Sequence, residues 1–129
     1  MSVQQVQPWA LFPSGDYRPL VMLRFDPEEL ADRYGLTFAT EHDDLDEFKL
    51  AAIALPDGSQ AWLTKYRGEQ GPGATVLVDA GADFARAKEL LLSTLGLTDA
   101  DLLWESPFVA HREQRPRIAR GASRVSPTD

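Results

Sequence analysis

The sequence predicts a single α+β domain: an antiparallel sheet of about four to five strands, with two to three helices packed mainly on one face. Three observations lead to this prediction. The residues at 56–58 predict a hairpin turn, apolar residues at helical spacing predict a capped amphipathic helix at 83–95, and predicted strands and helices follow one another in a defined order. From residue 20 onward that order is strand, helix, a run of further strands and two helices, which is typical of an α+β domain.

The hairpin prediction rests on the turn Pro56-Asp57-Gly58. Proline presets the first turn angle, aspartate suits the second, and glycine takes the positive φ of a bulge. If Leu55 faces Ser59, the strand pairs that follow are Ala52–Trp62, Leu50–Thr64, Ile53–Ala61 and Ala51–Leu63. Both faces of this hairpin are apolar near the turn. The second face therefore needs a cover, from helices, from the N-terminal segment or from another subunit.

The first helix is predicted to start at Asp26-Pro27 and to stop at Gly35, after a strand at 20–25. The aspartate can cap, the proline suits the first helical position, and Glu29 completes a capping box. Gly35 stands where a helix favours a left-handed residue. Alternating apolar residues then predict a second strand at 36–40.

The second helix is predicted over 83–95, after a strand at 74–79. Its apolar residues repeat at helical spacing, and Gly96 is expected to end it in a Schellman motif. The capping box of Thr98 and Asp101 predicts a third, short helix that ends near Trp104.

Composition divides the chain into an extended N-terminal arm (1–19), a globular α+β domain (20–111) and an arginine-rich C-terminal tail (112–129). The arm holds three prolines. Its rings Trp9 and Phe12 are expected to lie against the domain or a partner. The tail has five arginines against two acids, a net charge of +3 on a chain whose remainder carries −10.

The 129 residues include 20 acids, 13 bases and no cysteine, and the formal net charge is −7. The absence of cysteine excludes disulfides, thiolate metal sites and cysteine nucleophiles. The negative charge argues against a domain that binds nucleic acid or an anionic membrane. No apolar run approaches the roughly 18 residues of a membrane span and no signal peptide is visible, so we expect a cytoplasmic protein. Arginine supplies ten of the thirteen bases, which suggests a GC-rich, bacterial genome.

The densest group of candidate ligands is the acidic run 41–47. Nine acids and one base lie between Asp26 and Glu47. The run lacks the glycine and the final acid of a calcium loop, so we expect a solvated acidic surface. The glycines at 68–73 are followed by a strand pattern without a lysine, which excludes a phosphate-binding loop. No catalytic, cofactor-binding or metal-binding residue is predicted.

The leading hypothesis is a non-catalytic protein-interaction module of the immunity, adaptor or chaperone kind, or one that self-assembles. Its partner would be another protein or a second copy of the chain, with no cofactor. The predicted partner-binding residues are the arm rings, four acids and two tail arginines: Trp9, Phe12, Asp43, Asp44, Asp46, Glu47, Arg117 and Arg120. The acids would steer association. The tail is expected to pair with the acidic surface 26–47, in the same chain or a neighbour.

Two alternatives remain at this point. The first is a small enzyme or ligand-binding domain whose site is assembled from residues distant in sequence: His42, Asp44, Asp46, Tyr66, Arg67 and His111. The second is nucleic-acid contact through the basic tail. That tail has no lysine and no aromatic residue to stack on bases, which disfavours the second alternative.

Overall fold

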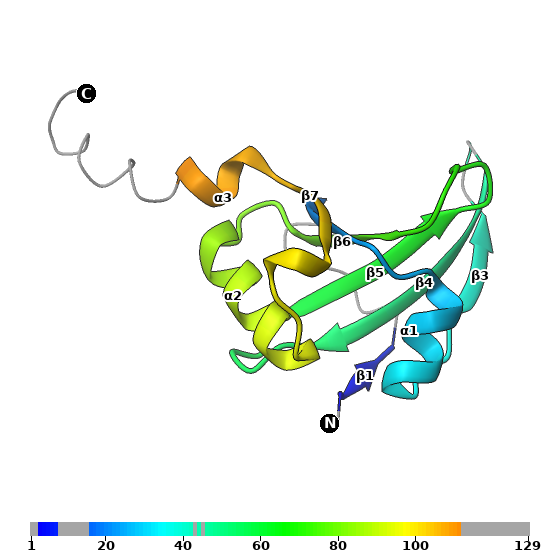
Figure 1. Cartoon of the computed structure of the whole chain (residues 1–129), viewed down its shortest axis with the longest axis horizontal. Coiled ribbons are helices and arrows are strands. Elements are labelled where there is room, and N and C mark those ends of the chain that lie inside the picture. The colour runs from blue at the N-terminus through cyan, green and yellow to red at the C-terminus, as the bar shows by residue number, and fades with distance from the viewer. Residues whose placement is uncertain (1–2, 8–15, 43, 45, 112–129) are drawn as a thin grey trace, which may run out of the picture.

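The computed structural model describes residues 3–7, 16–42, 44 and 46–111. Its elements are β1 (Gln5–Val6), β2 (Tyr17–Leu23), α1 (Pro27–Tyr34), β3 (Ala39–His42), β4 (Glu47–Ala54), β5 (Gln60–Tyr66), β6 (Ala74–Asp79), α2 (Phe84–Leu95), the 3₁₀ turn η1 (Asp99–Asp101), β7 (Leu102–Glu105) and α3 (Pro107–His111). The strands form one antiparallel sheet next to the helices, so the α+β class is confirmed (Figure 1). No helix among the described residues is long and apolar enough to cross a membrane.

The sheet has seven strands, so the predicted count of four to five is wrong. The two missed strands are β1 and β7. β1 is two residues long, too short for an alternating pattern to be visible. β7 lies where the capping box at 98–101 predicts a third helix; that helix stops after the single turn η1, and Trp104 lies in a strand instead. β2 also begins at Tyr17, three residues before the predicted strand.

The strand order is β1-β4-β5-β6-β2-β7, and β3 also pairs with β4. β5 occupies one edge of β4, so β1 and β3 share the other edge in succession: Val6 pairs with Ala52 and Ala39 with Leu50. The Gln5 side-chain amide bridges the two short strands. It donates to the Thr37 carbonyl at 2.7 Å and accepts from the Thr37 N–H at 2.9 Å.

The predicted hairpin register is confirmed at every pair. The Leu55 N–H donates to the Ser59 carbonyl at 2.8 Å, and Gly58 takes a φ of 90°. The turn chemistry therefore determines the pairing of the two central strands, because a shift by one residue would exchange their faces.

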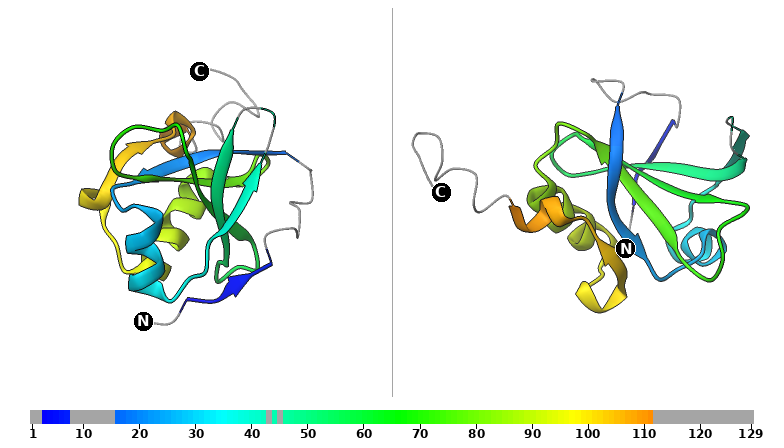
Figure 2. Two further views of the ribbon diagram at one scale, coloured as in Figure 1. Left: turned by 90° about the vertical axis from the view of Figure 1, so that its right-hand side faces the viewer. Right: turned by 90° about the horizontal axis from the view of Figure 1, so that it is seen from above.

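The ends of both long helices lie where the sequence predicts them. The Asp26 N–H donates to the Glu29 carboxylate at 3.1 Å, and Gly35 ends α1 with a φ of 70°. In α2, Asp83 caps the first turn and the left-handed Gly96 ends the helix. Side chains of α1 and α2 share one buried cluster with β2, β4, β5 and β6, so both helices cover the same face of the sheet (Figure 2).

The opposite face carries a smaller cluster made by Leu50, Ala52 and Trp62, against which Val6, Phe48 and Leu77 pack. None of the described helices contributes to it. Tyr17 lies beside Trp62, with ring centroids 5.3 Å apart. Tyr17, the first residue of β2, thus covers part of this second apolar face of the hairpin. Cover by the rest of the arm stays a prediction, because residues 8–15 lie outside the described part of the chain.

Candidate functional site

Four large hydrophobic side chains are exposed among the described residues, and three of them lie close together in sequence at one border of the sheet. Leu103 and Trp104 on β7 are 53% and 44% exposed, and Phe108 on α3 is 48% exposed; the fourth is Tyr17. We call Leu103, Trp104 and Phe108 the β7 strip. Within the described residues β7 pairs only with β2, which makes it an edge strand of the sheet.

A bulge in β7 sets the direction of Leu103. Trp104 pairs with Met22 and Leu102 with Leu23, so the register shifts and Leu103 is the extra residue. Bulges on edge strands redirect side chains. Leu103 lies against Gly73, where an added Cβ would be 3.1 Å from Leu103 Cδ1 and 2.9 Å from the Leu23 carbonyl oxygen. The positive φ of 125° and the close approach to the β2 backbone at Leu23 therefore require a glycine at 73.

Lys88 on α2 holds β7 to the helix layer. Its Nζ lies 2.5 Å from Glu105 and 2.8 Å from Asp99, and its side chain is only 16% exposed. Burial acts to lower the pKa of Lys88, but the hydrogen bonds to Asp99 and Glu105 outweigh it and leave the pKa above its ordinary value. The lysine therefore stays charged and serves as a fixed link between α2, η1 and β7.

Further contacts hold both ends of β7. The Arg24 guanidinium lies 2.9 Å from Asp101, just before the strand, and the Arg24 N–H donates to the Asp101 carbonyl at 3.0 Å. Hydrogen bonding from the Thr98 N–H and from Arg24 lowers the pKa of Asp101. After the strand, Phe108 packs edge-to-face on Phe84, with centroids 5.6 Å apart. The β7 strip is thus exposed on a segment that the fold holds in place.

The acidic surface predicted from the sequence is partly neutralised in the structure. Asp46 accepts hydrogen bonds from the Glu47 N–H at 2.7 Å and the Gly68 N–H at 3.0 Å, and it pairs with Arg67 at 3.1 Å. These contacts, the Glu47 bond first, lower the pKa of Asp46. Arg67 also lies 3.8 Å from Glu47. Asp46 and Glu47 therefore fasten the start of β4 to the loop after β5.

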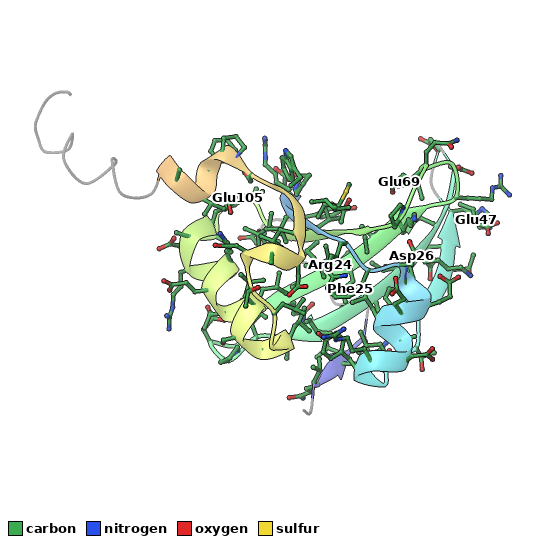
Figure 3. All side chains as sticks on the ribbon, viewed as in Figure 1. Arg24, Phe25, Asp26, Glu47, Glu69 and Glu105 are labelled. Atoms are coloured by element: carbon green, nitrogen blue, oxygen red, sulfur yellow. The ribbon has the colours of Figure 1, made fainter. Side chains whose placement is uncertain are left out.

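A shallow cleft of about 300 Å³ lies beside these residues. At its border the Asp26 carboxylate accepts from Lys65 Nζ at 2.9 Å and from the Gly73 N–H at 3.0 Å, and Lys65 also donates to the Gly71 carbonyl at 2.6 Å. The Lys65 bond is the main cause of the lowered pKa of Asp26. Glu47 and Glu69 line the same cleft, at the end of the sheet opposite Glu105 (Figure 3). Asp26 and Glu47 are paired with neighbouring cations and Glu69 accepts from the Tyr66 N–H at 2.7 Å, which suits a structural role better than proton transfer.

The residues considered for an enzyme divide between the two ends of the molecule. His42 lies 4.0 Å from Glu47, so it joins Asp46 and Arg67 in one group with the adjacent Tyr66. His111 belongs to α3, at the other end (Figure 1). No group of three or more histidine, aspartate or glutamate side chains that could hold a metal ion occurs within the part of the chain that the structure describes.

The predicted partner-binding residues have different outcomes. Asp44 is exposed, and Asp46 and Glu47 are engaged as described above. The others, Trp9, Phe12, Asp43, Arg117 and Arg120, lie outside the described residues. The β7 strip was missed, although three consecutive apolar residues at 102–104 are compatible with a strand. No protein-family model, curated protein or solved structure matches this chain.

Proposed function

We propose that this chain is a non-catalytic protein-interaction module that binds an extended segment of a partner protein along β7. The β7 strip is the observation that carries the proposal: two large apolar side chains on an edge strand, with a third on the following helix. An edge strand offers main-chain hydrogen bonds to an added strand, and alternate side chains supply contact area and specificity.

The charge of the chain favours a different protein over a second copy as the partner. The net charge is −7, and Asp99 and Glu105 stand at the ends of β7. Lys88 offsets only one of these two charges, so two copies would still bring like charge together, and a net charge far from zero opposes self-association. A segment with apolar residues flanked by basic ones would complement both the strip and its surroundings. Self-association is therefore an outcome that the test must be able to detect.

The test uses a random-peptide library selected on the full-length chain. Enriched peptides are then titrated against the wild type and against Leu103→Ser and Trp104→Ser. We expect Trp104→Ser to weaken binding about tenfold or more and Leu103→Ser to weaken it less, because hot-spot residues cost about 2 kcal/mol or more when truncated and are more often tryptophan than leucine. Tyr17→Ser is the matched control, since Tyr17 has similar exposure but lies outside the strip. Hydrogen exchange should show added protection at 102–105 when peptide is bound.

Light scattering measures the oligomeric state of each variant, so that loss of peptide binding can be told apart from a change in self-association. Thermal unfolding must show that the serine variants remain folded. Peptides that bind all variants equally, an empty selection, or a dimer that dissociates in Trp104→Ser without any peptide binding would overturn the proposal. The first two results would mean that the β7 strip does not bind peptides. The third would mean that it is a surface for self-association.

A further inference from the structure

A second concave surface lies between the turn of the β4–β5 hairpin and the first half of α2. The cleft has a volume of about 390 Å³. Its apolar wall includes Val78, Ala82 and Ala87, and its charged residues are Asp57, Asp79, Asp83 and Arg86. Three carboxylates and one guanidinium give this cleft a net charge of −2.

Local hydrogen bonds hold two of these carboxylates, Asp57 and Asp83, in place. Asp57 accepts from the Ser59 hydroxyl at 2.6 Å and from the Ser59 N–H at 3.0 Å, and these bonds lower the pKa of Asp57. Asp83 caps α2 by accepting from the Arg86 N–H at 3.1 Å. The N-terminal end of α2 contributes about half a positive charge, so the cleft remains negative overall.

The described chain ends in α3, which packs on α2, the helix that forms one side of this cleft. Phe108 on α3 packs on Phe84, which directly follows Asp83 in the cleft wall. Figures 1 and 2 show α2 and α3 at one end of the molecule and α1 and β3 at the other. The sequence continues for 18 residues, 112–129, with five arginines against two acids. Fully extended, 18 residues span about 60 Å, which is ample to cross the end of α2.

The acidic surface at 26–47 competes less well for this segment. It lies at the far end of the molecule, around α1 and β3 (Figure 1). Two of its carboxylates already have cationic partners, Asp26 with Lys65 and Asp46 with Arg67. The cleft lies at the same end of the molecule as α3, after which the arginine-rich segment begins, and among the residues that line it three carboxylates outnumber one cation.

We infer that the arginine-rich segment 112–129 binds in the cleft between the β4–β5 turn and α2 of its own chain. Its arginines contact the carboxylates at the border, and aliphatic parts such as Ile118 contact the apolar wall. Each exposed ion pair contributes only about 0.2–1 kcal/mol, but a short tether gives an effective concentration in the millimolar range. The contact is therefore populated at low salt and released at high salt. It does not depend on the β7 strip.

The absence of cysteine makes a direct test possible, because any disulfide then reports one chosen pair. We would place one cysteine in the segment by Ala119→Cys and a second in the cleft by Ala82→Cys. The reference pair combines Ala119→Cys with Thr37→Cys, in the competing surface. Oxidation at low salt should form the disulfide between positions 82 and 119 about tenfold faster than the disulfide of the reference pair. That preference should fall in about 1 M salt, where charges are screened beyond about 3 Å.

Charge-removing variants separate binding from mere proximity. Asp79→Asn with Asp83→Asn keeps a good helix cap, since asparagine is also a favoured N-cap residue. This double change should reduce the cleft preference, whereas Asp32→Asn with Asp44→Asn, on exposed acids at the far end, should leave it unchanged. Equal rates for the two cysteine pairs, indifference to Asp79 and Asp83, or disulfides formed between two chains instead of within one would each overturn the inference.

Discussion

The hydroxyl of Tyr34 donates a hydrogen bond to the carbonyl of Leu95 at 2.6 Å, and both partners are buried. Tyr34 is the last residue of α1 and Leu95 the last of α2, so this bond joins the C-terminal ends of the two helices. Burial raises the pKa of Tyr34. The bond satisfies a carbonyl at the end of α2, where the helix itself supplies no partner.

Tyr34→Phe should therefore lower the free energy of unfolding by about 1–2 kcal/mol, because it leaves the Leu95 carbonyl buried without its donor. Phenylalanine keeps the ring and its packing, so the change isolates the hydrogen bond. Urea unfolding monitored by circular dichroism measures the effect. An unchanged midpoint and slope would mean that water replaces the hydroxyl at no cost.

Asp26 should make stability depend on acid pH. Its folded pKa is lowered, chiefly by Lys65 and then by the Gly73 N–H, so its contribution is present above the unfolded pKa of about 3.9 and is lost as pH falls through the folded value. Asp26→Asn should cost about 1 kcal/mol at pH 7, a small value because the pair is partly solvated. The difference from the wild type should shrink below about pH 4.

Urea unfolding of both proteins between about pH 2 and 7 tests this. Glu28→Gln, an exposed acid in the same helical turn, is the control and should follow the wild type closely. A difference in the free energy of unfolding between wild type and Asp26→Asn that stays constant down to the lowest pH would show that the charge of the carboxylate does not contribute.

Gly73→Ala should be markedly more damaging than Gly71→Ala. Both glycines have positive φ, 125° and 76°, so alanine is strained at either position. Only at 73 does the new Cβ also meet backbone, 2.9 Å from the Leu23 oxygen. We expect a loss of about 1–2 kcal/mol at 71 and about 2–4 kcal/mol at 73, measured by thermal unfolding. Equal losses would mean that the β2 backbone at Leu23 shifts to accept the methyl group.

Short-range features of the fold could be predicted from sequence because they are encoded locally. The turn at 56–58 and the glycines after each long helix impose a backbone conformation on their own, whatever surrounds them. The strand that carries the β7 strip could not, because its pairing partner β2 is distant in sequence: Leu102 pairs with Leu23. A capping box at 98–101 is equally compatible with a long helix and with one turn, and only the pairing with β2 decides between them.

The sequence predicts a solvated acidic surface at 26–47 because the cations that pair with its carboxylates are distant in sequence. Nothing near Asp46 or Asp26 in the sequence shows that their partners are Arg67 and Lys65, which strand pairing brings beside them. Lys88 likewise reads as an ordinary helical lysine until η1 and β7 place Asp99 and Glu105 next to it. Charge counts alone therefore overestimate how much acidic surface is available to a partner.

Lys88→Met should loosen β7 while leaving the rest of the sheet intact. Methionine keeps most of the side-chain volume but removes both ion pairs, so we expect a loss of about 1–2 kcal/mol at pH 7. Because the folded pKa of Lys88 is raised, its contribution is complete below the unfolded pKa of about 10.4 and disappears as pH rises through the folded value. Hydrogen exchange should show faster opening at 102–105 than in β4 and β5. Lys49→Met, an exposed lysine bonded to Thr40 at 2.8 Å, is the control and should change little. If β7 exchanged as slowly in Lys88→Met as in the wild type, pairing with β2 alone would suffice to present the β7 strip.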